Sequence, residues 1–246
     1  MSFTRHALFF KQDFEGGYRY LDRCGEFLVL AQEHYGLIPT GDQTPSGGMM
    51  EAPDIGVKVE ANATFIRITQ ELPGNDVGVF VKYAEEISFL YRKLFSPIAI
   101  EKNNVALTTY LPFPTFEKAC NASLKWGTNA DSQENLGRTI GMPALSKATE
   151  YVYSSGSKRL TFKVRPVTFD NIRINRRNAG GQASKFQKQA IERQNKGAER
   201  MLKGDFLHAL YLELELSEEY PPQNAFSNLF AEIIEKETIL QQTAFK

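Results

Sequence analysis

The chain has 246 residues, of which 42% are apolar, 12% aromatic and 24% charged. This composition excludes a disordered, collagen-like or disulfide-stapled chain, and the length suffices for one large domain or two small ones. Lys and Arg (29) balance Asp and Glu (29), so the net charge indicates no class of partner. Two cysteines, Cys24 and Cys120, are typical of a reducing compartment, and no apolar run is long enough to span a bilayer. We therefore expect a soluble, cytoplasmic protein that does not associate with membranes.

The first half of the chain alternates between strand-like and helix-like patterns. Apolar side chains repeat every two residues in some runs and every three or four residues in others. In chain order we expect strand 6–14, helix 20–35, strands 55–59 and 63–69, helix 79–95 and strand 105–111. This order is the split βαβ, ferredoxin-like arrangement. It predicts an antiparallel sheet with strand 105–111 beside strand 6–14 and both helices on one face. The polar, turn-rich segment 41–48 is interpreted as a loop.

The second half has a weakly patterned stretch followed by more strands. One short helix is expected near 117–125. Alternation resumes at 159–169 and 207–216, and 225–242 is typical of an amphipathic helix. We therefore predict an α+β fold with tandem ferredoxin-like halves, antiparallel sheets and an inserted basic helix. The predicted parts are a ferredoxin-like domain over 1–112, a connecting region over 113–157 and a second strand-rich α+β domain over 158–246.

Charge is distributed unevenly along the second half. Residues 158–203 contain 13 Lys and Arg against 3 Asp and Glu, whereas residues 204–245 contain 1 basic and 8 acidic side chains. The basic segment, defined here as residues 173–203, begins with an arginine cluster and continues as a predicted helix with one basic face. Its candidate RNA-binding residues are Arg173, Arg176, Arg177, Lys185, Lys188, Arg193, Lys196 and Arg200.

A basic face of this kind suits a phosphate backbone, because each contact to a phosphate releases counterions. The competing interpretation is a solvated helix face. Glu192 and Glu199 stand four residues before Lys196 and Lys203, at the spacing of ion pairs that contribute about 0.2–0.5 kcal/mol each without any ligand. The arginine cluster is therefore the sharper part of the signal.

A general base near neutral pH is most often a histidine, and His34 at the end of helix 20–35 is the best candidate, followed by its neighbour Tyr35. The other two histidines fall on predicted strands, where packing is the simpler interpretation. No two histidines are close in sequence, so we predict neither a metal site nor a cofactor. Asp54 and Glu60 resemble fragments of a metal-dependent nuclease core, but the Glu-x-Lys that should follow is absent.

These features together resemble the repeat-processing endoribonucleases of CRISPR systems, within the RAMP superfamily. The resemblance rests on the ferredoxin-like first half with His34 at the end of its first helix, and on the second strand-rich half. It also rests on the run RINRRNAGGQASKFQKQAIERQNKGAER between strands, which is similar to the helix that some of these enzymes insert into an RNA hairpin groove.

The resemblance implies an RNA-binding, metal-independent endoribonuclease, a hydrolase of antiviral defence, that processes an RNA hairpin such as a CRISPR repeat. A ribose 2′-hydroxyl would attack the adjacent phosphorus and leave a 2′,3′-cyclic phosphate. His34 would accept the proton, and Arg173 or Arg177 would stabilise the charge on phosphorus. The implied partners are the RNA hairpin and subunits of a ribonucleoprotein complex. The alternative is a non-enzymatic scaffold subunit whose basic segment docks nucleic acid or an acidic partner, including the acidic segment 205–237 of another copy.

Overall fold

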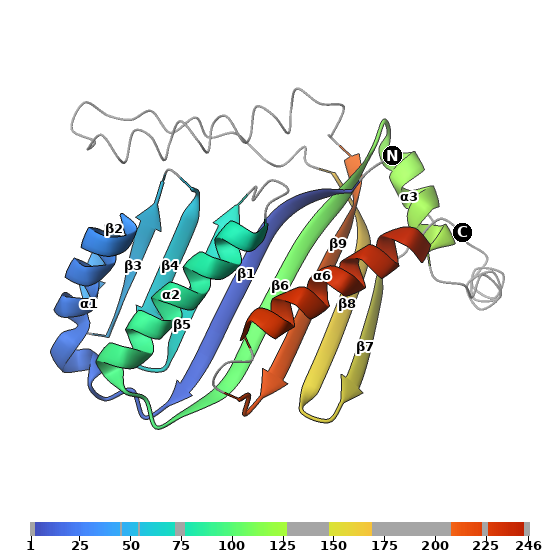
Figure 1. Cartoon of the computed structure of the whole chain (residues 1–246). Helices are drawn as coiled ribbons and strands as arrows, with labels where there is room; N and C mark the ends of the chain where they lie inside the picture. The colour runs from blue at the N-terminus through green and yellow to red at the C-terminus, as the bar shows by residue number, and fades with distance from the viewer. Residues whose placement is uncertain are drawn as a thin grey trace, which may run out of the picture.

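A computed structural model describes residues 3–44, 46–53, 55–71, 77–126, 148–168, 208–222 and 226–243. Within them the chain forms four helices and one nine-stranded sheet in which every neighbouring pair is antiparallel, in the order β2-β3-β4-β5-β1-β6-β9-β8-β7 (Figure 1). The predicted α+β class is thus confirmed. No helix in this part of the chain combines the length and apolarity needed to cross a membrane. The basic segment, with every RNA-binding residue predicted on it, lies outside the described residues.

The first half follows the predicted order closely. Its elements are β1 (Thr4–Glu15), α1 (Tyr20–Tyr35), β4 (Val57–Asn62), β5 (Phe65–Glu71), α2 (Val77–Phe95) and β6 (Ala99–Phe113). Strand β1 lies between β5 and β6 and is antiparallel to both, so the predicted neighbours 6–14 and 105–111 do pair. Both helices cover one face of the sheet, since the Phe27 ring of α1 packs against Tyr91 and Phe95 of α2.

The segment 41–48, predicted to be a loop, belongs instead to an additional hairpin of β2 (Ile38–Thr44) and β3 (Gly47–Ala52). Strand β3 pairs with β4 over its whole length, so pairing with the existing sheet overrides the local turn preference of the sequence. Gly48 permits this arrangement, because a Cβ there would collide with the Gln43 amide. That amide donates to the carbonyl oxygens of Thr40 (3.0 Å) and Met49 (2.9 Å) and holds the hairpin together.

The second half extends the same sheet. Its elements are α3 (Phe116–Lys125), β7 (Thr149–Ser155), β8 (Lys158–Thr168), β9 (His208–Glu219) and α6 (Phe226–Thr243). Strand β9 pairs with β6 on one side and with β8 on the other, so the predicted second ferredoxin-like half is not confirmed among the described residues. The leucines of β9 explain the continuity, because Leu214 and Leu216 lie opposite the apolar side chains of β6 and extend one core.

The sheet has a covered face and an open face. Side chains on the covered face are buried beneath the four described helices, all of which contribute to one core. From β1, β4, β5, β6, β9 and β8 this core includes Leu8, Phe10, Val59, Ile68, Leu107, Leu214 and Phe162. None of the described helices packs on the opposite, open face (Figure 1). The open face therefore presents every second side chain of the central strands.

Helix α6 is fastened to β1 by a buried ion pair. Glu237, only 2% exposed, accepts hydrogen bonds from Arg5 Nε (3.2 Å) and Nη2 (2.8 Å), and its other oxygen accepts from Gln241 (3.0 Å). Arg5 reaches the covered face because the β1–β6 register shifts between Arg5 and Ala7. The extra residue of such a β-bulge interrupts the alternation of side chains along β1, so that Arg5 points to the same face as Leu8.

Candidate nucleic-acid interface

The structure places His34 and Tyr35 at the end of α1 in different surroundings. Tyr35 is half-buried: its ring lies edge-on to Tyr83 (5.9 Å between centroids), and its carbonyl accepts a hydrogen bond from the Tyr83 hydroxyl (3.0 Å). Burial, reinforced by Glu86, raises the pKa of Tyr35, so its phenol is poorly suited to accept a proton. His34 is exposed, and the centroid of its ring lies 6.4 Å from that of the Tyr35 ring.

The two predicted catalytic residues are therefore brought together only as sequence neighbours. Because α1 packs on the covered face, His34 lies on the helix side of the molecule and not on the open face. Glu60 lies on β4, where it forms an ion pair with Arg67, and Asp54 is outside the described residues. In the described part of the chain, nowhere do three or more His, Cys, Asp or Glu side chains gather as a metal would require.

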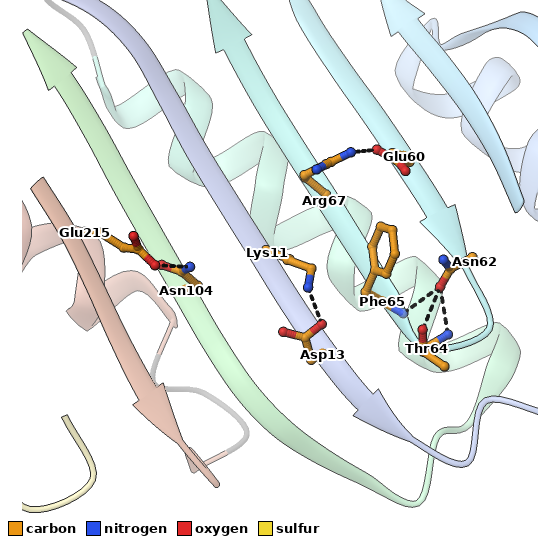
Figure 2. A network of polar contacts seen from close by, with 9 residues as sticks. All are labelled: Lys11, Asp13, Glu60, Asn62, Thr64, Phe65, Arg67, Asn104 and Glu215. Carbon is orange, nitrogen blue, oxygen red and sulfur yellow. Dashed lines mark hydrogen bonds and ion pairs between the residues drawn. The ribbon is translucent and has the colours of Figure 1, made fainter. Parts of the chain in front are cut away.

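A cluster on the open face was not anticipated by sequence. The Phe65 ring of β5 has two cations over it: Lys11 Nζ lies 4.9 Å, and the Arg67 guanidinium carbon 5.8 Å, from the ring centre (Figure 2). Lys11 and Arg67 are also directly opposite each other in the β1–β5 ladder. Like charges at opposed positions destabilise an antiparallel pair, whereas the face of an aromatic ring attracts each cation.

Two carboxylates offset this repulsion. Lys11 forms an ion pair with Asp13 (2.6 Å) along β1, and Arg67 forms one with Glu60 across from it on β4 (Figure 2). These four side chains remain between 25% and 41% exposed, and ion pairs at such positions contribute about 0–1 kcal/mol. Each cation can therefore exchange its carboxylate for a ligand at little cost.

Phe65 is held firmly by the turn that precedes β5. Asn62 Oδ1 accepts hydrogen bonds from the Thr64 backbone (2.8 Å), the Thr64 hydroxyl (3.0 Å) and the Phe65 backbone (2.9 Å) (Figure 2). On the covered side, the Tyr91 hydroxyl donates to the Asn62 carbonyl. An asparagine that accepts hydrogen bonds from the backbone two and three residues ahead fixes a turn, so the backbone of Phe65 is held in one conformation.

A shallow hollow of about 370 Å³ lies beside this cluster on the same face. It is lined by Phe9, Met49, Lys58, Val59, Glu60, Arg67 and Thr69. The half-buried Phe9 and the 42% exposed Met49 give it an apolar floor, and Arg67 belongs to both the hollow and the cluster. An apolar depression with a few polar groups at its rim is the general form of a small-ligand site.

A second group of rings lies on β1, β6 and β9, beside Arg165 of β8. His6 lies 6.3 Å from both Tyr110 and Tyr211, and the Arg165 guanidinium stands 5.5 Å from the centre of the Tyr211 ring. Burial raises the pKa of both tyrosines. Burial also lowers the pKa of His6, against a smaller opposing effect of Glu71. These three groups are therefore uncharged near neutral pH, whereas the Arg165 guanidinium beside them is charged.

The same region receives both ends of the segment that contains residues 173–203. Thr168, the last residue of β8, pairs with His208, the first residue of β9, and Thr168 Oγ1 lies 2.7 Å from His208 Nδ1. Arg165 and Tyr211 are opposed three residues earlier in the same ladder. The β8–β9 ladder therefore fixes the positions of the two residues that flank 169–207.

The signal for the open-face cluster was present in the alternation of the two strands. Positions 9, 11 and 13 of β1 and 65, 67 and 69 of β5 are the outward members of each run, but only the strand register brings them together. No known protein-family model matches this chain, and no curated protein sequence is similar enough to count as a match.

Proposed function

We propose that this protein binds RNA and that a single-stranded part of the RNA lies across the open face. The observation that carries the proposal is the Phe65 ring beneath Lys11 and Arg67 on the two central strands of the β4-β5-β1-β6 group. Four-stranded sheets that read single-stranded RNA stack bases on aromatic side chains of their surface. Such stacking contributes about 1–3 kcal/mol per base, and neighbouring cations add to it.

The basic segment supplies the charge that the open face lacks. Asp13 and Glu60 neutralise Lys11 and Arg67, so the face alone attracts a polyanion weakly. Residues 173–203 contain 9 Lys and Arg against 2 Asp and Glu, and this excess of positive charge attracts a polyanion strongly. An RNA hairpin suits both parts, because an A-form stem is bound through its phosphates whereas unpaired loop bases are free to stack.

The proposal includes the metal-independent cleavage that the family resemblance implies, together with the tandem ferredoxin-like layout predicted from the order of the elements in the sequence. Cleavage with His34 as the base would require the RNA to pass from the open face around the sheet to the end of α1.

The second candidate function is that of a non-enzymatic scaffold. It is favoured by the carboxylates beside Lys11, Lys58 and Arg67, since a face of paired charges suits a protein partner as well as RNA.

The decisive experiment measures binding of labelled single-stranded RNA, an RNA hairpin and duplex DNA by fluorescence anisotropy at several salt concentrations. Phe65→Leu, which removes the ring and keeps an apolar side chain, should weaken RNA binding about tenfold with an unchanged salt dependence. Tyr18→Leu is the matched control, because Tyr18 is 79% exposed and lies outside the sheet. Parental affinity in Phe65→Leu, or no RNA binding by the parent, would leave the scaffold as the function.

Two further variants separate binding from catalysis. Replacing Arg173, Arg176 and Arg177 together by alanine should reduce the slope of log affinity against log salt by roughly 1 for each lost phosphate contact. His34→Ala should keep the affinity and slow cleavage about 10²–10⁴-fold, the usual contribution of a positioned base. Cleavage products that lack a 2′,3′-cyclic phosphate would contradict the proposed chemistry.

A further inference from the structure

A second hollow lies on the covered side of the sheet, between α2, β1 and the first turn of α6. Its volume is about 270 Å³, and it is lined by Gln12, Glu85, Ser88, Phe89, Arg92, Phe226 and Ser227. The residues from α2 recur at three- and four-residue steps and so form one stripe along the helix. This hollow shares no residue with the open face.

Two buried polar groups line the hollow without a hydrogen-bond partner among the described residues. Gln12 is 1% exposed, and its amide nitrogen donates to Asn103 Oδ1 (2.8 Å), but its Oε1 accepts no hydrogen bond. Ser88 is 2% exposed, and its Oγ has no partner either. Buried polar atoms are nearly always satisfied, so two unsatisfied atoms beside one hollow point to a bound species that completes them.

Positive charge at the hollow comes from Arg92, on the same α2 stripe as Ser88, and from the first turn of α6. Arg92 is half-buried there, and burial lowers the pKa of its guanidinium without removing its charge. Phe226 and Ser227 are the first helical residues of α6, an 18-residue helix with no acidic side chain in its first turn. The N–H groups of a first helical turn lack intrahelical partners and, together with the helix dipole, favour an anion.

We propose that this hollow binds a small molecule with a carboxylate or phosphate at one end and an ammonium or hydroxyl group at the other. The anionic end contacts Arg92 and the first turn of α6. The donor end satisfies Gln12 Oε1, while Ser88 Oγ bonds either end because a hydroxyl both donates and accepts. Glu85 adds a second acceptor for the donor end, and Phe89 and Phe226 flank the ligand with apolar surface.

Size supports a ligand larger than one water molecule. A water takes up about 30 Å³ in the liquid, so a hollow of about 270 Å³ accommodates a molecule of amino-acid size. An α-amino acid and a hydroxylated phosphate share the required chemistry of one anion and one donor. A free anion supplies only half of it, and a neutral polyol supplies only the other half.

Isothermal titration calorimetry and thermal unfolding of the full chain test the proposal with four probes at equal ionic strength. L-Serine and glycerol 3-phosphate carry both ends, sulfate carries only the anion, and glycerol carries only the donor. We expect one of the first two to bind at least tenfold more tightly than sulfate and glycerol and to raise the melting temperature. Tighter binding of serine would identify an amino acid, and tighter binding of glycerol 3-phosphate a phosphate ester.

Two variants place the binding in the hollow. Arg92→Gln should weaken the better probe tenfold or more, whereas Lys93→Gln, its exposed neighbour on α2, removes the same charge and should leave affinity unchanged. Ser88→Ala, a small substitution that preserves packing, should weaken the probe several-fold even if Arg92→Gln fails to fold. Absence of heat and of stabilisation with all four probes, or equal loss in Lys93→Gln and Ser88→Ala, would overturn the proposal.

Discussion

The two faces of the sheet use the same strands for different purposes. On β1, Leu8 and Phe10 are completely buried beneath the helices, whereas Phe9 and Lys11 between and after them lie on the open face. On the covered face, Arg5 and Glu237 form an ion pair in which the carboxylate is buried. The open face instead tolerates like charges opposite each other. A fold stabilised from one side can therefore carry an unfavourable arrangement on the other side, where a ligand can use it.

The largest contrast should come from neighbouring phenylalanines. Phe10 is 0% exposed and its ring centroid lies 3.7 Å from that of Phe226, so Phe10→Ala should cost about 3–5 kcal/mol of unfolding free energy. Phe9→Ala, on the open face, should cost about 1.5 kcal/mol or less because its ring is only half-buried. Chemical denaturation of both variants checks this. Equal losses would mean that the open face is packed as tightly as the core.

Breaking an ion pair on the covered face should likewise cost more unfolding free energy than breaking one on the open face. Arg5→Met leaves the Glu237 carboxylate buried without its cation and should cost about 3 kcal/mol. The double variant Arg5→Met/Glu237→Leu should recover most of this loss, because an apolar pair leaves no buried charge. Arg67→Met should cost about 1 kcal/mol or less, since its pair with Glu60 is exposed. A double variant as unstable as Arg5→Met would show that shape and not charge holds α6.

Open-face cations should affect binding more than folding. Lys11→Gln removes one of the two opposed positive charges and the contact with the Phe65 ring, so unfolding free energy should change by about 0.5 kcal/mol or less. The same substitution should weaken RNA affinity several-fold. Lys93→Gln on the helix side is the control for loss of one positive charge. Identical affinities in the two variants would remove Lys11 from the interface.

The smallest expected effect is a pH dependence from His6. Its folded-state pKa is lowered, mainly by burial, so the unfolded chain takes up a proton more readily. This contribution to stability is present above the unfolded pKa of about 6.5 and is lost as pH falls below it. His6→Phe keeps a ring between Tyr110 and Tyr211, so its melting temperature should fall less than that of the parent between pH 7.5 and 5.5. Parallel curves would exclude His6 as the cause.

Sequence periodicity predicted the elements that build the core. Helices 20–35 and 79–95 and the strands around them were recognisable because their burial repeats with the period of each element. Strands β2, β3 and β7 were not predicted. They lie at or near the edges of the sheet, where hydrogen-bonded pairing holds them more than an apolar pattern does. The continuous sheet was also missed, because which strand neighbours β9 is decided by the register of its leucines against β6.

The candidate site was less accessible to sequence reasoning. His34 was chosen by residue type, which carries no information on which side of the sheet it lies. The cluster of Lys11, Phe65 and Arg67 was overlooked because Phe65 and Arg67 follow Lys11 by 54 and 56 residues. The three side chains meet only across the β1–β5 ladder. Gln12 and Ser88 stand near apolar residues in the sequence, and only their missing hydrogen-bond partners in the structure distinguish them.

The closure of β8 onto β9 has a consequence for how this protein can vary. Thr168 and His208 are hydrogen-bonded neighbours, so the sheet already brings the ends of residues 169–207 together. The entropy of closing such a connection grows only with the logarithm of its length, about 0.6 kcal/mol for each doubling. Doubling or halving the number of residues between Thr168 and His208 should therefore change the stability of the sheet by less than about 1 kcal/mol through closure entropy, because the β8–β9 ladder fixes both flanking residues.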